Sequence, residues 1–507
     1  MAGTPNTPGP PNGQPPIPPE KISVKKETGL LLKHSSIYGM APAVSRLLGF
    51  LMIPLYLEYL SPADYGVMDL LYTTTSLIEM VVGVGVAYGV ARFYFDSDIQ
   101  SERNKVISSA FLGLGGLLVP VVAILIIASS FFASVILDSK DYDDYFVLAF
   151  LTMGLGMLNQ INLAYLRAEK RSLTVVISTV SQVVINLSLN VYLIVVQDMG
   201  VAGIFWGNLI AVAFTMSWLT PLVLRRVGLG FSVDVVKGLI KFGLPLIPSN
   251  IANYIVVASD RYFVKEFVSV SETGIYSLGY KFGSLINNFV TSPFNQIYAP
   301  RRLELFKKED SHELFGKVFT YFVCAITFVG LGISMLSRDV IFLLNDRYHE
   351  AYQVVPLLTL GHIALSFFYH FNIGIIISKQ TKYFAYINMT NAAVNLALNF
   401  ILIREYGMWG AAISTTICFA LRAAMGYWFS RKFVPVVVEW RRVIIVMVTA
   451  FVYYFVFEPM SFGGNVTSAI VKGLICCTFP LMLFVARFFN AEEKAYMAKF
   501  LRKLRGR

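Results

Sequence analysis

The sequence has 507 residues, of which 56% are hydrophobic and 14% charged, and its formal net charge is +11 at pH 7. Because so apolar a composition does not suit soluble domains of this length, we predict an all-α polytopic membrane protein. The positive charge then reflects membrane topology and anionic lipid headgroups, and we expect no nucleic-acid partner.

The chain is predicted to begin with a disordered cytoplasmic tail over residues 1–32. Residues 1–20 contain eight prolines among small polar residues and no apolar stretch, which is typical of a disordered segment and excludes a signal peptide. The other end, residues 491–507, has the pattern of a basic amphipathic helix on the inner membrane surface.

Between these tails the chain consists of long apolar segments. A helix needs about 20 apolar residues to cross the hydrocarbon layer. Fourteen segments meet this requirement: 37–57, 66–91, 107–137, 145–166, 173–196, 201–224, 240–259, 273–298, 315–337, 353–377, 383–403, 408–430, 440–457 and 464–489. We therefore predict about 14 transmembrane helices.

The distribution of lysine and arginine predicts the orientation of these helices. If the N-terminus is cytoplasmic, 32 of the 42 lysines and arginines lie on the cytoplasmic side and six lie on the other side. This asymmetry follows the positive-inside rule, so both termini are predicted to be cytoplasmic.

An internal repeat divides the apolar region. INLSLNV at 185–191 is nearly repeated by VNLALNF at 394–400, and Gly66 and Tyr72 match Gly274 and Tyr280 at an offset of 208. Several matches at nearly one offset predict two pseudo-symmetric six-helix lobes related by an axis along the membrane normal. The predicted boundaries are 33–228 for the N-terminal lobe, 229–434 for the C-terminal lobe and 435–490 for a final helix pair.

Two predicted helices carry polar stripes that we expect to line a cleft between the lobes, because polar groups facing lipid are costly. In the second helix the stripe is Asp69, Tyr72, Ser76 and Glu79, and in the eighth it is Ser277, Tyr280, Lys281, Ser284, Asn288, Thr291 and Asn295. The alternative is hydrogen bonding between helices within one lobe. Tyr72, Tyr280, Ser284 and Asn288 are taken as candidate substrate contacts.

Charged residues inside predicted spans are the strongest candidates for function. We expect Arg46, Lys281 and Arg422 to line the cavity and contact an anionic group; the alternative is internal pairing, such as Arg46 with an acid of the second helix.

Four further charges receive other roles. Asp69 and Glu79 are candidates for ion coupling, Arg92 could receive an incoming headgroup at the cytoplasmic end, and Lys472 is expected to reach the outer interface.

The remaining polar residues point to structure. The four cysteines all lie in predicted spans and form no metal or disulfide pattern, and no catalytic cluster or cofactor site is expected. His362 and His370 are more readily explained by packing than by proton relay. Asn186, Asn190 and their matches Asn395 and Asn399 favour helix packing over substrate contact. Prolines such as Pro245, Pro248 and Pro293 predict bends in the seventh and eighth helices.

The chain resembles a family of membrane transporters over about residues 33–490. The segments that carry this resemblance are KHSSIYGMAPAVSRLLGFLMIPLYLEYLSPADYGVMDLL at 33–71, GLPLIPSNIANYIVVASDRYFV at 243–264 and ETGIYSLGYKFGSLI at 272–286. They are similar to the polysaccharide flippases, in the O-antigen and exopolysaccharide branch of the multidrug/oligosaccharidyl-lipid/polysaccharide (MOP) exporter superfamily. The proline-rich tail falls outside this pattern.

The resemblance implies a flippase and not an enzyme. Its substrate would be an undecaprenyl-pyrophosphate-linked oligosaccharide, moved across the bacterial inner membrane to the periplasmic leaflet by alternating access. Its cationic cavity would use Arg46, Lys281 and Arg422, and a polysaccharide polymerase machinery is a possible partner. The alternatives are a lipid II flippase, a multidrug or cation antiporter of the same superfamily, and, less favoured, an integral membrane polysaccharide polymerase.

Overall fold

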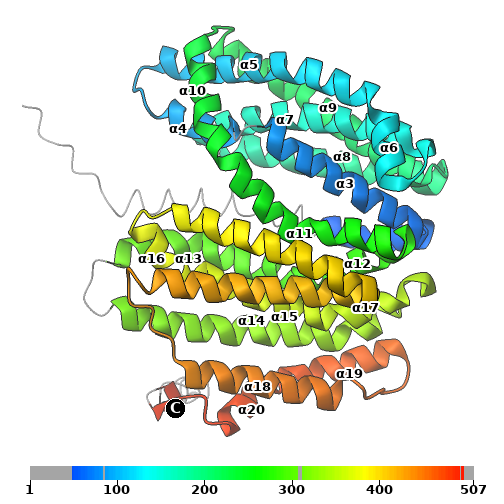
Figure 1. Cartoon of the computed structure of the whole chain (residues 1–507), viewed down its shortest axis with the longest axis vertical. Coiled ribbons are helices and arrows are strands. Elements are labelled where there is room, and N and C mark those ends of the chain that lie inside the picture. Colours follow the sequence, from blue (N-terminus) through cyan, green and yellow to red (C-terminus); the bar gives the residue numbers. More distant parts are fainter. Residues whose placement is uncertain (1–47, 84–85, 307–310, 492, 496–507) are drawn as a thin grey trace, which may run out of the picture.

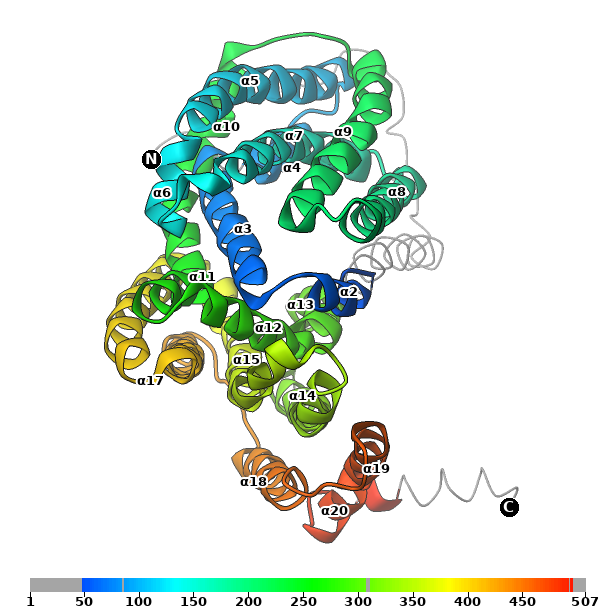
Figure 2. The same ribbon diagram turned by 90° about the vertical axis from the view of Figure 1, so that its right-hand side faces the viewer.

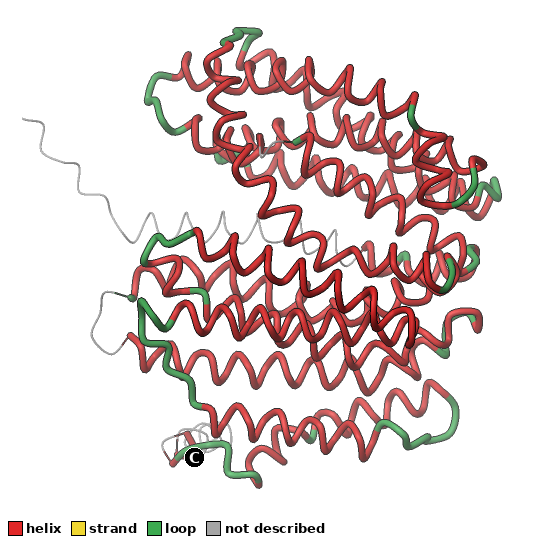
Figure 3. The backbone as a smooth tube through the Cα atoms, in the orientation of Figure 1, coloured by secondary structure: helices red, strands yellow, loops and turns green. Residues whose placement is uncertain are grey.

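The computed structural model describes residues 48–83, 86–306, 311–491 and 493–495. These residues form helices joined by short loops (Figure 3). Ten of the described helices are long and apolar enough to cross a membrane, and a shorter apolar helix spans Leu48–Tyr59. The predicted all-helical membrane protein is therefore confirmed. Both predicted tails, except residues 491 and 493–495, lie outside the described residues.

The first group of helices is called the N-terminal bundle. It contains α2 (Ile53–Tyr59), α3 (Pro62–Val82), α4 (Val86–Tyr94), α5 (Gln100–Ile127), α6 (Ser129–Leu137), η1 (Lys140–Tyr142), α7 (Asp143–Ala168), α8 (Ser172–Val191), η2 (Tyr192–Val196) and α9 (Gly200–Val227). Within it, α7 packs against α9, α5 and α4, and α8 packs against α9.

The second group is called the C-terminal bundle. It contains α11 (Ile247–Phe267), α12 (Val270–Ile286), η4 (Asn287–Thr291), α13 (Ser292–Leu305), α14 (Ser311–Ile341), η5 (Asp346–Val354), α15 (Val355–Phe371), α16 (Ile373–Ile377) and α17 (Lys382–Ser430). Here α17 packs against both α11 and α15, and α12 packs against α15.

The two bundles lie side by side and meet along α3, which packs against α12 and α11 (Figures 1 and 2). Three further helices, α18 (Trp440–Phe457), α19 (Asn465–Cys477) and α20 (Phe479–Val485), lie beyond the C-terminal bundle, where α18 and α19 pack on α14. The region between the bundles is thus bordered by α3 on one side and by α11 and α12 on the other.

One segment belongs to both bundles. Helix α10 (Val233–Gly243) packs on α4 and α5 of the N-terminal bundle, and the 3-10 turn η3 (Leu244–Leu246) then joins it to α11 of the C-terminal bundle. Because Pro245 and Pro248 cannot donate helical hydrogen bonds, the backbone bends here, as the sequence predicted. The predicted seventh helix, 240–259, thus begins in the last turn of α10, which packs on the N-terminal bundle, and continues in α11 of the C-terminal bundle.

Local signals explain where the central helices begin. Ser61 caps α3 through a capping box in which its hydroxyl accepts from the Asp64 backbone N–H while the Asp64 carboxylate accepts from the Ser61 N–H. Ser269 caps α12 in the same position, accepting from the Glu272 N–H. Both starts lie at one end of the molecule, called the Ser61 end, together with the loop at Asp138.

The predicted spans fall on described helical segments, but several are interrupted. The eighth range is divided into α12, η4 and α13, the tenth into η5, α15 and α16, and the last into α19 and α20. The second range is divided into α3 and α4, and the third into α5 and α6, where the chain turns at Ala128. The ranges 383–403 and 408–430 lie in the two halves of α17, which are two helices joined by a kink at Gly407 with φ 52° and ψ −132°. The first range is described only from residue 48.

Candidate functional site

The bundles touch most closely where Gly66 on α3 meets Gly274 on α12. A Cβ on Gly66 would lie 2.1 Å from the Val270 carbonyl oxygen, and a Cβ on Gly274 would lie 1.9 Å from that of Pro62. Only glycine permits this approach of two backbones. The two glycines are the pair matched in the sequence repeat, so equivalent positions of the two halves face each other.

A cluster of buried charges lies next to this contact. Asp69 on α3 accepts hydrogen bonds from Ser277 Oγ at 2.7 Å and from Arg261 Nε at 3.3 Å. Arg261 also donates to Asp260 Oδ1 at 2.6 Å, and its guanidinium lies 4.0 Å from the centre of the Tyr280 ring. Each charge is thus paired, as burial requires. The Asp69 to Arg261 pair joins the two bundles.

The cluster continues into the C-terminal bundle. Asp260 is 1% exposed and accepts hydrogen bonds from the hydroxyls of Tyr276 and Thr415. At the edge of the Ser61 end, Lys265 Nζ lies 2.5 Å from the Asp138 carboxylate of the opposite bundle. The Lys265 contact thus joins the two bundles at the Ser61 end.

Lys281, a predicted anion contact, also reaches across to the N-terminal bundle. Its Nζ lies 2.7 Å from the hydroxyl of Tyr65, which is fully buried, and it lies 4.4 Å from the centre of the same ring. Among the described residues, no carboxylate forms an ion pair with Lys281. The side chain is half-buried.

Arg422, the second predicted anion contact that the structure describes, lies in the second half of α17. It donates from Nη1 to Asn253 Oδ1 of α11 at 2.6 Å, and its guanidinium lies 4.7 Å from the centre of the Phe368 ring. Its buried Nε has no hydrogen-bond partner, and no described carboxylate forms an ion pair with it. Arg422 is therefore a cation inside a span whose charge no described acid balances.

Arg422 is bonded to α11, the helix that also packs against the N-terminal bundle. Its partner Asn253 precedes Tyr254, whose hydroxyl donates to the Thr73 carbonyl of α3 at 3.0 Å. A neighbouring bond between Thr74 and Tyr262 joins the same two helices at 2.8 Å. Helix α11 therefore contacts both Arg422 and α3 of the N-terminal bundle, through different residues.

The polar stripe of α3 divides between two environments. Asp69 belongs to the charge cluster, whereas Tyr72, Ser76 and Glu79 line a cavity of about 250 Å³ together with residues of α7 and α9. The Tyr72 hydroxyl accepts from Asn208 Nδ2 at 2.6 Å, and the Tyr72 ring lies 5.4 Å from that of Phe205. Asp69 thus meets the other bundle, whereas the cavity of Tyr72, Ser76 and Glu79 is lined by their own bundle, and their place in a cleft between the lobes stays a prediction.

The stripe of α12 is mostly occupied by internal contacts. Tyr280 is buried beneath Arg261, and Ser284 Oγ donates to the Lys281 carbonyl of its own helix at 2.9 Å. Asn288 is half-buried in the π-helical turn η4. Their predicted substrate contacts remain predictions; the Ser284 bond lies within its own helix and is not the interhelical bond of the alternative.

Two other predicted site residues lie away from this region. Arg92 is exposed at the end of α4, and its guanidinium lies 5.0 Å from the centre of the Phe242 ring on α10, so it is at the opposite end from Ser61. Arg46 lies outside the described residues, and its role and its suggested pairing stay predictions.

The two candidates for ion coupling differ in their contacts. Asp69 is bonded to Arg261 and Ser277, which leaves Glu79 as the less constrained acid of the two.

The structure corrects the expectation for Lys472. Its side chain is 1% exposed and forms a 2.8 Å ion pair with Asp339, so it does not extend to the outer interface. Asp260 and Arg261 were also missed, because the seventh helix was ended at residue 259 whereas α11 continues to Phe267. A carboxylate and a guanidinium adjacent in an otherwise apolar run were the available signal.

The histidines and repeated asparagines have the packing environments that the sequence favoured. His362 lies against Tyr280 and Phe419, and His370 stacks on Phe319. Asn395 and Asn399 bond to each other and to Ser259 of α11.

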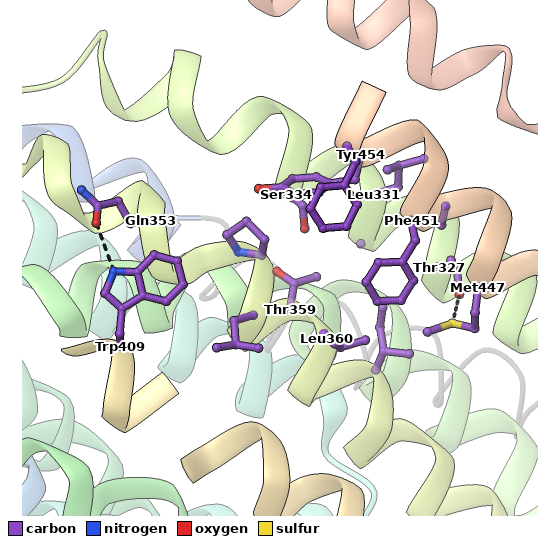
Figure 4. Close-up of a pocket in the computed structure, with 16 residues that line it drawn as sticks. Thr327, Leu331, Ser334, Gln353, Thr359, Leu360, Trp409, Met447, Phe451 and Tyr454 are labelled. Carbon is purple, nitrogen blue, oxygen red and sulfur yellow. Dashed lines mark hydrogen bonds between the residues drawn. The ribbon is translucent and has the colours of Figure 1, made fainter. Parts of the chain in front are cut away.

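A second hollow lies between the C-terminal bundle and α18 (Figure 4). It measures about 350 Å³, and its wall is largely aliphatic and aromatic, with Leu331, Leu360 and Phe451 among its residues. At one side Trp409 Nε1 donates to Gln353 Oε1 at 3.2 Å, as the dashed line in Figure 4 marks. Such a surface suits an apolar chain.

Comparison with known proteins agrees with the predicted relationship. Residues 59–304 match the family described as polysaccharide biosynthesis protein. A protein of Shigella flexneri named putative O-antigen transporter is 24% identical over 395 residues, which cover 73% of this chain and 90% of that protein.

Solved structures of the same fold are also found. Lipid II flippase MurJ in an inward closed conformation superposes with a TM-score of 0.69 at 14% identity, over 88% of this chain and 99% of that one. An inward-facing multidrug resistance MATE transporter of the MOP superfamily gives 0.60 at 15% identity, over 80% and 99%. These likenesses confirm the fold that the sequence predicted, which is that of MurJ and of the MATE transporters.

Proposed function

We propose that this multi-pass membrane protein, a MOP-fold transporter related to polysaccharide biosynthesis proteins, is a flippase for an undecaprenyl-pyrophosphate-linked oligosaccharide. It moves this substrate from the cytoplasmic to the periplasmic leaflet of a bacterial inner membrane. The observation that carries the proposal is the uncompensated guanidinium of Arg422 inside a span, bonded to α11, which packs against α3.

The two bundles are proposed to be pseudo-symmetric six-helix lobes with boundaries at 33–228 and 229–434, followed by the helix pair of 435–490. The ten long apolar helices correspond to 14 proposed crossings. Helix α17 is counted as two crossings. Three more crossings are the first predicted range, α3 together with α4, and α12 together with η4 and α13. The pairing of repeat-matched Gly66 with Gly274 supports an axis between the lobes.

The orientation follows from the lysine and arginine distribution. Both termini are placed in the cytoplasm, so the Ser61 end faces the periplasm. The charge cluster and the glycine contact then form a closed outer gate, and the substrate enters from the cytoplasmic end, where Arg92 is exposed. Alternating access requires the gate to open while the cytoplasmic end closes.

The pyrophosphate is proposed to bind at Arg422 and Lys281, with Arg46 as a further candidate. A doubly charged headgroup cannot cross hydrocarbon without compensating donors, and a guanidinium presents paired N–H groups suited to phosphate oxygens. Retaining an unpaired arginine in a span costs several kcal/mol. Phosphate binding gives that unpaired charge a function.

The lipid carrier is proposed to use the apolar hollow beside α18. Since this hollow lies between the C-terminal bundle and the last helices, an isoprenoid chain there could stay in contact with the bilayer while the headgroup moves. A cation antiporter, the main alternative class, would need an acidic site, whereas both described acids of the inter-bundle cluster are already paired with Arg261.

The test is flipping of the labelled lipid-linked oligosaccharide in proteoliposomes. Arg422→Ala is expected to reduce the rate about 10- to 100-fold, since it removes hydrogen bonds made by a charged group. Lys281→Ala and Arg46→Ala should reduce it in the same direction. Arg404→Ala is the matched control, because Arg404 is exposed and lies near the Ser61 end.

The outcomes separate the possible roles of these charges. Normal flipping by all three variants, at matched levels of folded protein, would assign the charges to structure. Absence of flipping by the wild-type protein would contradict the proposed function.

A further inference from the structure

We propose that the cavity between α3, α7 and α9 is a sugar-binding subsite, which takes one neutral sugar ring of the glycan while the pyrophosphate lies at Arg422. This inference rests on the proposed flippase function and adds a separate place for the carbohydrate. The site lies wholly in the N-terminal bundle, whereas Arg422 lies in the C-terminal bundle. Each bundle would thus hold a different chemical part of the substrate.

The lining has the chemistry that a sugar requires. Tyr72 offers an aromatic ring against which the C–H face of a sugar can pack, and the buried Phe205 supports this ring at 5.4 Å. Glu79 contributes a carboxylate, and Gln160 an amide with both a donor and an acceptor, to the same cavity. A mixed aromatic and polar wall of this kind orients a ligand through a few placed hydrogen bonds.

A chain of amides holds the aromatic wall in position. Asn190 donates to Asn186 at 3.3 Å, Asn186 donates to Asn208 at 2.6 Å, and Asn208 donates to the Tyr72 hydroxyl at 2.6 Å. The first two belong to the repeated INLSLNV segment. The Tyr72 ring is therefore fixed before any ligand binds, which lowers the entropy lost on binding.

The equivalent tyrosine in the other half has a different environment. Tyr280, matched to Tyr72, is covered by the Arg261 guanidinium at 4.0 Å and is buried. Tyr72 instead is 37% exposed and faces the cavity. The two halves of the repeat have thus diverged, and among the described residues the open polar cavity belongs to the N-terminal half.

Charge and size decide which part of the substrate fits. Glu79 is exposed to the cavity and forms no ion pair with a described base, so its carboxylate would repel a pyrophosphate. The volume of about 250 Å³ is below the roughly 300–1,000 Å³ of pockets for drug-sized ligands. One neutral ring fits these limits better than a charged headgroup or a whole oligosaccharide.

Gly156 provides a direct test of occupancy. It lines the cavity, and a Cβ added there meets no atom within 4 Å, so Gly156→Cys should fold normally and present a thiol to the cavity. The probes are undecaprenyl pyrophosphate with one attached hexose and the same carrier without sugar. Labelling by a small maleimide is measured in vesicles, with the wild-type protein giving the background of the native cysteines.

The sugar-bearing carrier should slow labelling of the Gly156→Cys thiol about tenfold, because one or two hydrogen bonds and a ring contact give a binding energy of that size. The sugar-free carrier should not protect the thiol. Gly116→Cys is the matched control: Gly116 lies on α5 outside the cavity with equally open space, and neither carrier should protect it. Equal protection by both carriers, or protection by neither, would overturn the sugar subsite.

A second variant separates this inference from the proposed function. Gln160→Ala should weaken protection by the sugar-bearing carrier severalfold, because one hydrogen-bonding amide is lost. If the wild-type protein flips the lipid-linked oligosaccharide while no protection occurs, the flippase stands and the subsite is wrong. If the wild-type protein flips nothing, the proposed function fails whatever the protection shows.

Discussion

Lys472 and Asp339 join α19 to α14 through a buried ion pair whose side chains are 1% and 8% exposed. Lys472→Met is expected to destabilise the protein by about 3–5 kcal/mol, because it leaves a buried carboxylate without its counter-charge. The double variant Lys472→Met with Asp339→Leu should recover most of this loss, since no charge then remains buried. Thermal unfolding in detergent measures both effects.

An exposed pair provides the control for this prediction. Arg301 and Glu304 are 62% and 63% exposed, and Arg301→Ala should leave the unfolding temperature nearly unchanged. If Lys472→Met behaved like Arg301→Ala, the buried pair would contribute nothing to holding the final helices.

The same residues show what the sequence could reveal at this scale. The polar stripe of Tyr72, Ser76 and Glu79 follows helical phase, so it was predictable. The partner of Lys472 was not, because Asp339 lies far away in the chain and only the packing of α19 on α14 brings them together. Arg261 was misplaced for a local reason: its polarity resembled a loop, although Asp260 and Asp69 balance it inside the protein.

At the scale of the element, the turn at Gly407 permits α17 to reverse between its two halves. With φ at 52° and ψ at −132°, this position suits glycine, and an added Cβ would lie 2.6 Å from Glu272 Oε1. Gly407→Ala should therefore destabilise the protein by about 1–3 kcal/mol. The measurement is again the unfolding temperature in detergent.

Gly473 is the control, because alanine at this position is not expected to lower the stability of the protein. It lies inside α19, where an added Cβ meets nothing within 4 Å, so Gly473→Ala should be neutral or stabilise by up to about 1 kcal/mol. An equal response of the two glycines to alanine would contradict a special role for the Gly407 backbone.

The presence of a helix was easier to predict from the sequence than the residues at which it begins and ends. Apolar length placed the predicted spans from the second onward on described helices, and Pro245 and Pro248 marked the bend at η3. The sequence could not show that α10 packs on α4 and α5 while α11 packs on α17, since both halves look like one apolar helix. That division depends on contacts between distant segments.

At the scale of the whole molecule, the repeat predicted two similar halves, and the structure adds how they meet. Repeat-matched Gly66 and Gly274 lie against each other, and Asp69 bonds with Ser277, its match at the same offset. The closed Ser61 end thus combines a close backbone contact with an ion pair. Substitutions that separate these backbones test whether this end is a gate.

Gly274→Ala is expected to force the Ser61 end open. The new Cβ would lie 1.9 Å from the Pro62 carbonyl oxygen and 2.9 Å from the Gly66 nitrogen, both backbone atoms that cannot rotate away. Overpacking of this kind costs about 1–3 kcal/mol in the closed state. A cost of this size changes the ratio of open to closed molecules about 5- to 150-fold.

The measurement uses the thiol of Gly156→Cys in vesicles of known orientation, with an impermeant maleimide added to one side. With Gly274 intact, labelling should come from the cytoplasmic side, because the Ser61 end is closed; with Gly274→Ala it should also come from the periplasmic side. Gly116→Ala, with open space around its Cα, should leave the pattern unchanged. Labelling of Gly274→Ala from the cytoplasmic side alone would mean that this contact does not control access, and that the barrier lies deeper between the bundles.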